Sequence, residues 1–268
     1  MLKMVAVDMD GTLLNDAKEL PEATFAMIEK LREKGVMFVV ASGRQYHSLL
    51  ELFDPVKDEI LIVAENGGLI FDKGEIIFSD AIPRESVHKI VETAHKIPGT
   101  RIFICGLESS YLFEQGMTDE VGQNIRAYFP RMKGIKALEE LPESEQVIKI
   151  AIYDESENAE ETFGKGLKHL FNKYQLAVSG AGWIDVMNTG VNKGEAIKKL
   201  QKRYAVEKEQ TMVFGDQMND FEMMQEAYYS YAMANAVDQI KEVANFLAPS
   251  NEEQGVIQIL ENFLAMTK

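Results

Sequence analysis

The sequence predicts an α/β fold, in which a smaller α+β domain is inserted into a parallel sheet core. Near both ends of the chain, short and continuously apolar segments alternate with amphipathic helical stretches, which is typical of strands buried on both faces of a parallel sheet. Between residues 83 and 187 the pattern changes to short strands that follow one another more directly. We therefore expect a Rossmann-like core made of residues 1–82 and 188–268, with residues 83–187 forming the insertion.

The N-terminal part of the core alternates strands with helices and ends in a hairpin. In its first helix Phe25, Ile28 and Leu31 share one face, Pro21 suits the first turn and Gly35 the end. This alternation predicts right-handed crossovers between parallel strands. The expected elements are strand 5–7, helix 22–34, strand 36–41, a helical stretch ending near residue 53, strand 60–64, and hairpin strands 69–71 and 76–78.

The insertion combines strands and helices in a different order. Its segment 147–153 alternates polar and apolar residues more than the early strands do, so we expect a sheet with one solvated face. The expected elements are helix 84–96, strands 101–104 and 111–113, a helix near 119–128, strands near 133–137 and 147–153, helix 157–173, and strands 176–178 and 183–187.

The strand–helix alternation returns after residue 188. Ala196, Ile197 and Leu200 lie on one side of the first predicted helix of this part. The expected elements are helix 194–204, strand 211–214, helix 221–227, strand 229–234, helix 237–244, strand 246–248 and helix 254–266.

Composition excludes several classes of function. With 28 basic and 43 acidic residues the net charge is −15, which disfavours binding to nucleic acids and to anionic membranes. The single cysteine, Cys105, excludes an intramolecular disulfide, and its apolar neighbours predict a buried core thiol. No apolar run reaches the ~18 residues of a membrane span, and the N-terminus lacks a signal-peptide pattern. We expect a cytoplasmic protein; the sequence does not indicate its oligomeric state.

Acidic residues follow the first strand directly. Asp8 and Asp10 lie where ligands bind in α/β sheets, just beyond the carboxyl end of a strand, and Gly11 allows the backbone to turn close to a bound group. One acid could attack as a nucleophile while the other transfers a proton. The alternative is a structural Asp-Gly turn with capping acids.

Other polar groups follow further buried strands of the same predicted sheet. Ser42 and Gly43 follow one strand, Asp216, Asn219 and Asp220 follow another, and Lys193 opens the helix before the latter. If the strands are parallel, all these groups meet at one edge of the sheet.

Such a cluster requires a cation. At ~4 Å and an effective dielectric constant near 20, each pair of the carboxylates Asp8, Asp10, Asp216 and Asp220 would cost about 4 kcal/mol. Oxygen ligands without a cluster of His or Cys favour Mg²⁺. The donors suited to holding a phosphate are Ser42, the amide of Gly43, Lys193 and Asn219.

Each of these residues also has an ordinary structural interpretation. Ser42 could cap a helix, Lys193 could be one of many surface lysines, and Asp216 and Asp220 could cap helix 221–227. Their joint occurrence at strand ends, in this order, favours a functional site.

Four segments of the chain resemble the motifs of the haloacid dehalogenase (HAD) superfamily. Residues 8–12 (Asp-Met-Asp-Gly-Thr) are similar to its first motif, residues 41–44 (Ala-Ser-Gly-Arg) to the second, Lys193 to the third and residues 215–220 to the fourth. The α+β insertion between the second and third motifs resembles the Cof-type phosphatases, whose cap domain is of the C2 type. The second motif carries Ser where many relatives carry Thr, so the hydroxyl is retained.

The resemblance implies a role for each residue. Asp8 would attack phosphorus and form an aspartyl-phosphate, and Asp10 would protonate the leaving alkoxide and then activate water. Mg²⁺ would bind to the carboxylates of Asp8 and Asp216 and to the main-chain carbonyl of Asp10, with Asp220 nearby, binding through water or orienting Lys193. An aspartate at position 10 favours a phosphatase or phosphomutase over a dehalogenase or ATPase. The groups holding the phosphoryl group would be the amides of Met9 and Gly11, together with Ser42, Gly43, Lys193 and Asn219.

The resemblance implies a small phosphorylated metabolite as substrate, from a range that includes sugar phosphates, pyridoxal phosphate and flavin mononucleotide. Two other functions remain open: a phosphotransferase or phosphomutase on the same scaffold, and a non-catalytic protein that binds a phosphometabolite. Residues that could contact the substrate at the boundary of core and cap, or be structural instead, are Arg44, His47, Asn66, Glu114, Met117 and Trp183.

Overall fold

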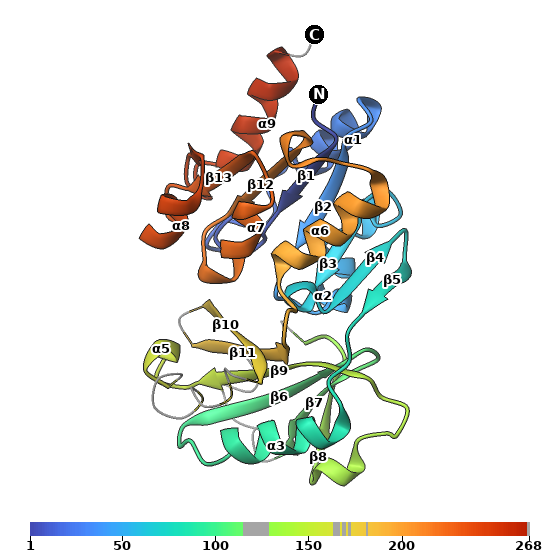
Figure 1. Ribbon diagram of the computed structural model, residues 1–268, viewed down its shortest axis with the longest axis vertical. Coiled ribbons are helices and arrows are strands. Elements are labelled where there is room, and N and C mark those ends of the chain that lie inside the picture. Colours follow the sequence, from blue (N-terminus) through green and yellow to red (C-terminus); the bar gives the residue numbers. More distant parts are fainter. Residues whose placement is uncertain (115–128, 163–166, 168–169, 171–172, 181, 267–268) are drawn as a thin grey trace. The chain divides into compact units, whose positions relative to one another are not determined.

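The computed structural model describes residues 1–114, 129–162, 167, 170, 173–180 and 182–266. The chain divides into two compact units (Figure 1). The core unit consists of Met1–Gly43, Leu50–Phe78 and Asn192–Lys268, and the inserted unit of Arg44–Leu49 and Ser79–Val191.

The core unit is built on a sheet with the strand order β14-β13-β12-β1-β2-β3-β4-β5. All pairs from β14 to β3 are parallel, and β4 pairs with β3 in the antiparallel direction. The predicted α/β fold with a parallel sheet core is therefore confirmed. The strands are β1 (Met4–Val7), β2 (Met37–Ala41), β3 (Leu61–Ala64), β4 (Leu69–Asp72), β5 (Glu75–Ser79), β12 (Thr211–Gly215), β13 (Tyr229–Met233) and β14 (Phe246–Ala248).

Strand β1 lies in the middle of this sheet, and every residue of it is buried. It pairs in register with β2 on one side and with β12 on the other, so that Val7 lies beside Val40 and Phe214. Because these neighbours run parallel, the residues that follow them in the sequence leave the sheet at the same edge.

The helices of the core unit begin and end close to the predicted positions. In the view of Figure 1, α6 and α7 lie in front of the sheet. Helix α6 starts at Lys193 because the side chain of Asn192 caps it, accepting a hydrogen bond from the amide of Glu195 at 2.8 Å. The core helices are α1 (Thr24–Glu33), α6 (Lys193–Tyr204), α7 (Phe221–Gln225), α8 (Asp238–Val243) and α9 (Gly255–Met266).

The inserted unit has a second sheet with the order β10-β11-β9-β6-β7-β8. Its pairs are antiparallel except for β7 with β8. The strands are β6 (Thr100–Gly106), β7 (Ser110–Phe113), β8 (Met132–Ile135), β9 (Val147–Asp154), β10 (Tyr174–Gly180) and β11 (Trp183–Asn188). The described α-helices of this unit are α3 (Arg84–Ala94) and α5 (Ala159–Thr162), together with the first part of α2 (Tyr46–Leu52), whose last three residues belong to the core unit.

The expectation that this second sheet has one solvated face is wrong. Strand β9 is buried on both sides, because one face packs in an aliphatic cluster with α3, and Ala151 on the other face packs in a cluster with Phe103, Cys105 and Phe129. The polar residue in β9 that suggested a wet face is Lys149, which is buried and lies 3.4 Å from the buried Asp185. Cys105 is a buried free thiol, as predicted.

Two expected helices of the insertion fall partly or wholly outside the described residues. The helix near 119–128 lies outside them, and only Ala159–Thr162 of the predicted helix 157–173 is described as helical. No helix in the described part of the chain has the length and apolar character needed to cross a membrane.

Candidate active site

A buried lysine connects two carboxylates in the core unit. Lys193, the first residue of α6, is fully buried, and its ammonium donates to Asp8 and to Asp220 at 2.6 Å each. Asp8 directly follows β1, and Asp220 belongs to the turn after β12. The interpretation of Lys193 as a surface lysine is therefore wrong, because its charge is enclosed by acids from two strand ends.

Asp216, which follows β12, is the third carboxylate of this cluster. Oxygen atoms of Asp8, Asp216 and Asp220 lie within 4.8 Å of one another, and all three residues are buried. The hydroxyl of Thr12 donates to Asp216 at 2.9 Å. Gly11 has a φ of +81°, and a Cβ at this position would collide with the carboxylate of Asp216. Only glycine fits both the left-handed backbone and this close approach.

The carboxylate of Asp220 accepts hydrogen bonds from Lys193 and from two backbone amides. One of its oxygens accepts from Lys193, and the other accepts from the amides of Asp216 at 2.9 Å and Gln217 at 3.1 Å. The interpretation of Asp220 as a cap of helix 221–227 is wrong, because its side chain does not cap α7 and closes the short 3-10 turn Met218–Asp220 instead. These bonds occupy both oxygens of Asp220, so Asp8 and Asp216 are better suited to a metal ion.

The charges of this cluster balance only when two of its three acids keep their protons or when a cation binds. Burial raises the pKa of Asp8 to about 7 against the opposing attraction of Lys193. Burial and the neighbouring Asp8 and Asp220 raise the pKa of Asp216 to about 8. Burial alone would lower the pKa of Lys193, but the two aspartates that it contacts outweigh that effect and raise it. The ammonium is therefore firmly charged, while two of the acids resist ionisation.

The donor set fits a divalent cation. Three buried carboxylates face one ammonium, which leaves a net negative charge whenever all of them are ionised. Oxygen donors of this kind are the ligands that hard cations such as Mg²⁺ prefer. An ion between Asp8 and Asp216 would offset the effects of burial and of the neighbouring acids, which raise their pKa values.

The carboxylate of Asp10 lies apart from the buried cluster. It forms an ion pair with Lys18 at 3.0 Å, and its side chain is 32% exposed. Met9, between the two acids, is fully buried, and its carbonyl accepts from the amides of Leu13 at 3.1 Å and Leu14 at 2.9 Å. The loop therefore points Asp8 inward and leaves Asp10 accessible from solvent.

The residues after β2 lie beside the turn after β3. The amide of Ser42 donates to Val63 at 2.9 Å, and the carbonyl of Ser42 accepts from the amide of Asn66 at 3.0 Å. Ser42 is buried, and it is not the N-cap of α2, because that helix begins only at Tyr46. The loop of the second motif is thus held by the backbone of the neighbouring strand.

Asn66 links the second and fourth motifs. The side chain of Asn219 donates to Asn66 at 3.0 Å, and a Cβ on Gly43 would lie 3.1 Å from the same Asn66 oxygen. Asn66 is buried and has a left-handed backbone with a φ of 54°. Asn66, Gly43 and Asn219 therefore form one group beside the carboxylates, although the sequence had suggested Asn66 only as a contact near the cap.

The other suggested boundary residues belong to the inserted unit. His47 lies 3.3 Å from the carbonyl of Leu107, Arg44 is half-buried, and Glu114 is exposed. Trp183 packs against Tyr153 at 4.9 Å and Phe103 at 5.4 Å between ring centroids, which favours its interpretation as a core residue. Met117 lies outside the described residues.

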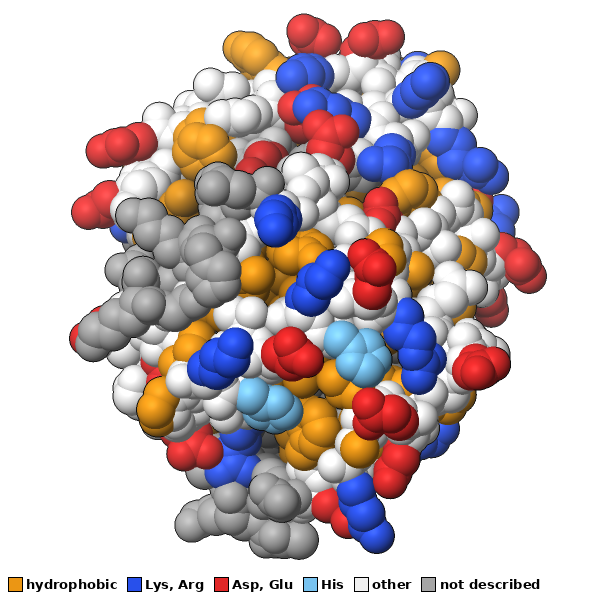
Figure 2. Space-filling view, turned by 60° about the horizontal axis from the view of Figure 1, so that its bottom comes forward, with side chains coloured by type: hydrophobic (Ala, Val, Ile, Leu, Met, Phe, Trp, Pro, Cys, Tyr) orange, Lys and Arg blue, Asp and Glu red, His pale blue; other side chains and the backbone are white. Residues whose placement is uncertain are grey.

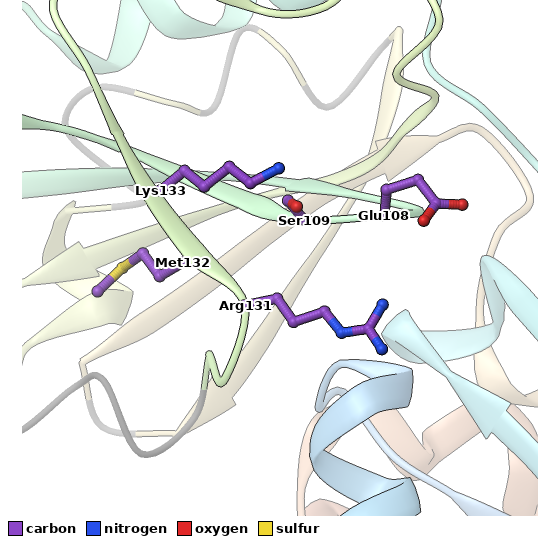
Figure 3. A pocket seen from close by; sticks show the side chains of 5 residues that line it. All are labelled: Glu108, Ser109, Arg131, Met132 and Lys133. Carbon is purple, nitrogen blue, oxygen red and sulfur yellow. The ribbon is translucent and has the colours of Figure 1, made fainter.

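The inserted unit also has a cavity of about 450 Å³, which none of the predicted site residues lines. Its lining residues are Glu108, Ser109, Arg131, Met132 and Lys133. In Figure 3 the side chain of Lys133 points toward Ser109.

Figure 2 shows basic and acidic side chains interspersed on one face of the molecule, so the negative net charge does not form a single acidic field there.

Sequence reasoning missed two asparagines at this edge of the core sheet. Asn235 follows β13 and donates to the carbonyl of Gly11 at 2.7 Å, and Asn251 follows β14 and donates to the carbonyl of Leu14 at 3.1 Å. The rule that located Asp8 and Asp216, a polar residue soon after a strand of the parallel sheet, also applies to Asn235, which follows β13. It did not indicate Asn251, because β14 is largely exposed and ends at Ala248.

Comparisons with known proteins identify the family of this chain. A family model of haloacid dehalogenase-like hydrolases matches residues 5–260. The chain is 31% identical to 5-amino-6-(5-phospho-D-ribitylamino)uracil phosphatase YbjI of Escherichia coli (strain K12) over 98% of this chain and 96% of that protein. The crystal structure of SMU.1108c from Streptococcus mutans UA159 aligns with a TM-score of 0.90 at 32% identity, over 99% of this chain and 100% of that one. The HAD subclass IIB sugar phosphatase BT4131 shares the fold, with a TM-score of 0.81 at 22% identity over 97% and 98% of the two chains.

The family match includes all four motifs, which confirms the resemblance to Cof-type phosphatases of the HAD superfamily. The chain therefore belongs to the haloacid dehalogenase-like hydrolase family, and it is a phosphatase of that family.

Proposed function

We propose that this protein hydrolyses small phosphate monoesters with Mg²⁺, through an aspartyl-phosphate on Asp8. The observation that carries the proposal is the buried Lys193 between Asp8 and Asp220, with Asp216 beside them. A lysine and a carboxylate nucleophile at one site can bind a phosphoryl group and accept it.

The reaction has two halves. In the first, a carboxylate oxygen of Asp8 attacks phosphorus, the bond from phosphorus to the ester oxygen breaks, and Asp10 gives its proton to the leaving alkoxide. In the second, Asp10 takes a proton from water and the water oxygen attacks phosphorus. The bond between phosphorus and the Asp8 oxygen breaks, which frees phosphate and restores the Asp8 carboxylate. Asp10 suits both steps because its carboxylate is accessible and does not belong to the buried cluster.

Other groups of the core unit would hold the transferring phosphoryl group. Lys193 provides positive charge, and Ser42, Gly43 and Asn219 provide hydrogen-bond donors, with the amides of Met9 and Gly11 on the nucleophile loop. The carboxylates of Asp8 and Asp216 and the carbonyl of Asp10 would hold Mg²⁺, with Asp220 orienting Lys193. When bound, the ion supplies positive charge to the carboxylates and the phosphoryl oxygens.

The inserted unit would serve as a C2-type cap that selects the substrate. The E. coli relative is named for 5-amino-6-(5-phospho-D-ribitylamino)uracil, and a structural neighbour is named a sugar phosphatase. We therefore propose a sugar phosphate or a phosphorylated cofactor precursor as the substrate class.

The test is a panel of phosphorylated metabolites incubated with Mg²⁺ and read out as released phosphate. The panel should include 5-amino-6-(5-phospho-D-ribitylamino)uracil and several sugar phosphates. Hydrolysis should stop with EDTA, return with Mg²⁺ and be strongly slowed in the Asp10→Asn variant. Turnover that persists without a metal ion would contradict the cation site. Tight binding of a panel member without hydrolysis would contradict the catalytic proposal, and phosphate transfer that requires an acceptor would indicate a transferase.

A further inference from the structure

Two asparagines, one after β13 and one after β14, form hydrogen bonds to the loop that follows Asp8. Asn235 donates through its side-chain nitrogen to the carbonyl of Gly11 at 2.7 Å, and its side-chain oxygen accepts from the amide of Asn251 at 3.1 Å. A backbone carbonyl can only accept and a backbone amide can only donate, so these partners fix the orientation of the Asn235 amide.

Asn251 continues this connection. It is buried, and its side-chain nitrogen donates to the carbonyl of Leu14 and to the carboxylate of Asp16, both at 3.1 Å. The next residue, Glu252, accepts from the amide of Asp16 at 2.6 Å. The two strand ends of β13 and β14 are therefore connected to the loop at Gly11, Leu14 and Asp16.

The loop held in this way contains the groups that the proposed reaction needs. Gly11 directly follows Asp10, and the loop closes on itself through a bridge between Asp10 and Leu14. The next residue in the sequence, Thr12, donates through its hydroxyl to the carboxylate of Asp216. Movement of the Gly11 carbonyl would therefore change the direction of Asp10 and the contact with Asp216 together.

We propose that Asn235 and Asn251 are positioning residues that fix the direction of the Asp10 carboxylate toward the leaving group. This inference rests on the proposed function, because it requires Asp10 to transfer a proton. Neither asparagine would touch the substrate; both act through the backbone from Gly11 to Asp16.

The chain offers a matched control. Asn245 is exposed, as Asn235 is, and its side chain donates to the backbone carbonyl of Tyr228 at 2.9 Å. It directly precedes β14 and contacts the residue before β13, so it lies at the amino ends of the same two strands. Asn245→Ala therefore removes a similar bond from the opposite edge of the sheet.

The experiment compares Asn235→Ala, Asn251→Ala and Asn245→Ala on two substrates. One is p-nitrophenyl phosphate, whose leaving group needs little protonation, and the other is an alkyl phosphate that the unchanged protein hydrolyses. Because kcat/KM reports the steps up to departure of the alcohol, a misplaced proton donor should affect the alkyl phosphate more. We expect kcat/KM for the alkyl phosphate to fall roughly 10- to 100-fold in Asn235→Ala and at least several-fold less for p-nitrophenyl phosphate. Asn245→Ala should stay within about twofold on both.

Equal losses on both substrates, or no loss in Asn235→Ala, would overturn the inference. Asn235→Ala is the decisive variant because its side chain is exposed, whereas Asn251→Ala leaves a buried gap. Asp10→Asn separates the two proposals. If Asp10→Asn loses more activity on the alkyl phosphate than on p-nitrophenyl phosphate and Asn235→Ala does not, only the positioning role of the asparagines fails. If Asp10→Asn loses the same activity on both substrates, Asp10 is not the proton donor.

Discussion

Binding of Mg²⁺ to the protein without substrate should depend steeply on pH. Burial raises the pKa of Asp8 to about 7, and burial with the neighbouring acids raises the pKa of Asp216 to about 8. A carboxylate must lose its proton to ligate a metal ion, so protons and Mg²⁺ compete for these two side chains. Lowering the pH from 8 to 6 is the perturbation.

The two pKa values give the size of the effect. If about 7 and about 8 are the two apparent pKa values of this interacting pair, the fraction of molecules with both carboxyls ionised falls from about one half at pH 8 to about one in a thousand at pH 6. The apparent Kd for Mg²⁺ should therefore rise by roughly two to three orders of magnitude over this range. About two protons should be released per ion bound at pH 6, and fewer than one at pH 8.

Isothermal titration calorimetry measures both quantities. Repeating each titration in two buffers with different ionisation enthalpies gives the number of protons released with each ion. Asp216→Asn is the matched variant, because it removes one of the two titrating groups and should lower the proton release at pH 6 to about one. A Kd that stays constant from pH 6 to 8, with no proton release, would refute the assignment of Asp8 and Asp216 as the ligands.

Three further predictions concern turnover and stability. Asp8→Asn should abolish phosphate release while the thermal midpoint stays at or above that of the unchanged protein, since an acid with a raised pKa is removed; retained turnover would exclude Asp8 as the nucleophile. Lys193→Met should lower the free energy of unfolding by about 3–5 kcal/mol in urea titrations, because two buried acids lose their partner. The control is Lys198→Met, which should lower it by no more than about 1 kcal/mol because the side chain of Lys198 is 47% exposed. Equal losses in the two variants would contradict the burial argument. Without metal, stability should fall as pH rises from about 4 to 8, because folded Asp8 and Asp216 retain protons that the unfolded chain releases near the ordinary pKa of 3.8; a stability that rises over this range in chemical denaturation would contradict the raised pKa values.

The core unit could be predicted from the sequence because its signals are local. Continuous apolar strands such as Met4–Val7 and Thr211–Gly215 are buried on both faces, and each ends at a polar residue. Side chains that follow parallel strands lie at one edge, and so does the start of a helix that leads back to the next strand, so the proximity of Asp8, Lys193 and Asp220 could be predicted from topology.

Side-chain directions within that edge could not be predicted. The sequence suggested that Asp10 joins the acidic cluster, but its carboxylate pairs with Lys18 instead. The sequence also did not reveal that Asn66, whose backbone is left-handed, lies beside Gly43 and accepts a hydrogen bond from Asn219. The two-sided burial of β9 was missed because a buried ion pair between Lys149 and Asp185 has the same sequence pattern as a solvated face.

The central place of β1 in the core sheet has a consequence for synthesis of the chain. Its partner β12 begins at Thr211, so on the ribosome one side of β1 waits for more than two hundred residues before it can pair. During that interval an apolar strand has an open edge, which is a hazard for aggregation. The inserted unit is nearly contiguous in sequence and is translated in full before β12 appears. We expect truncations that remove β12 to give insoluble protein, and chaperones to be most important for this protein during elongation.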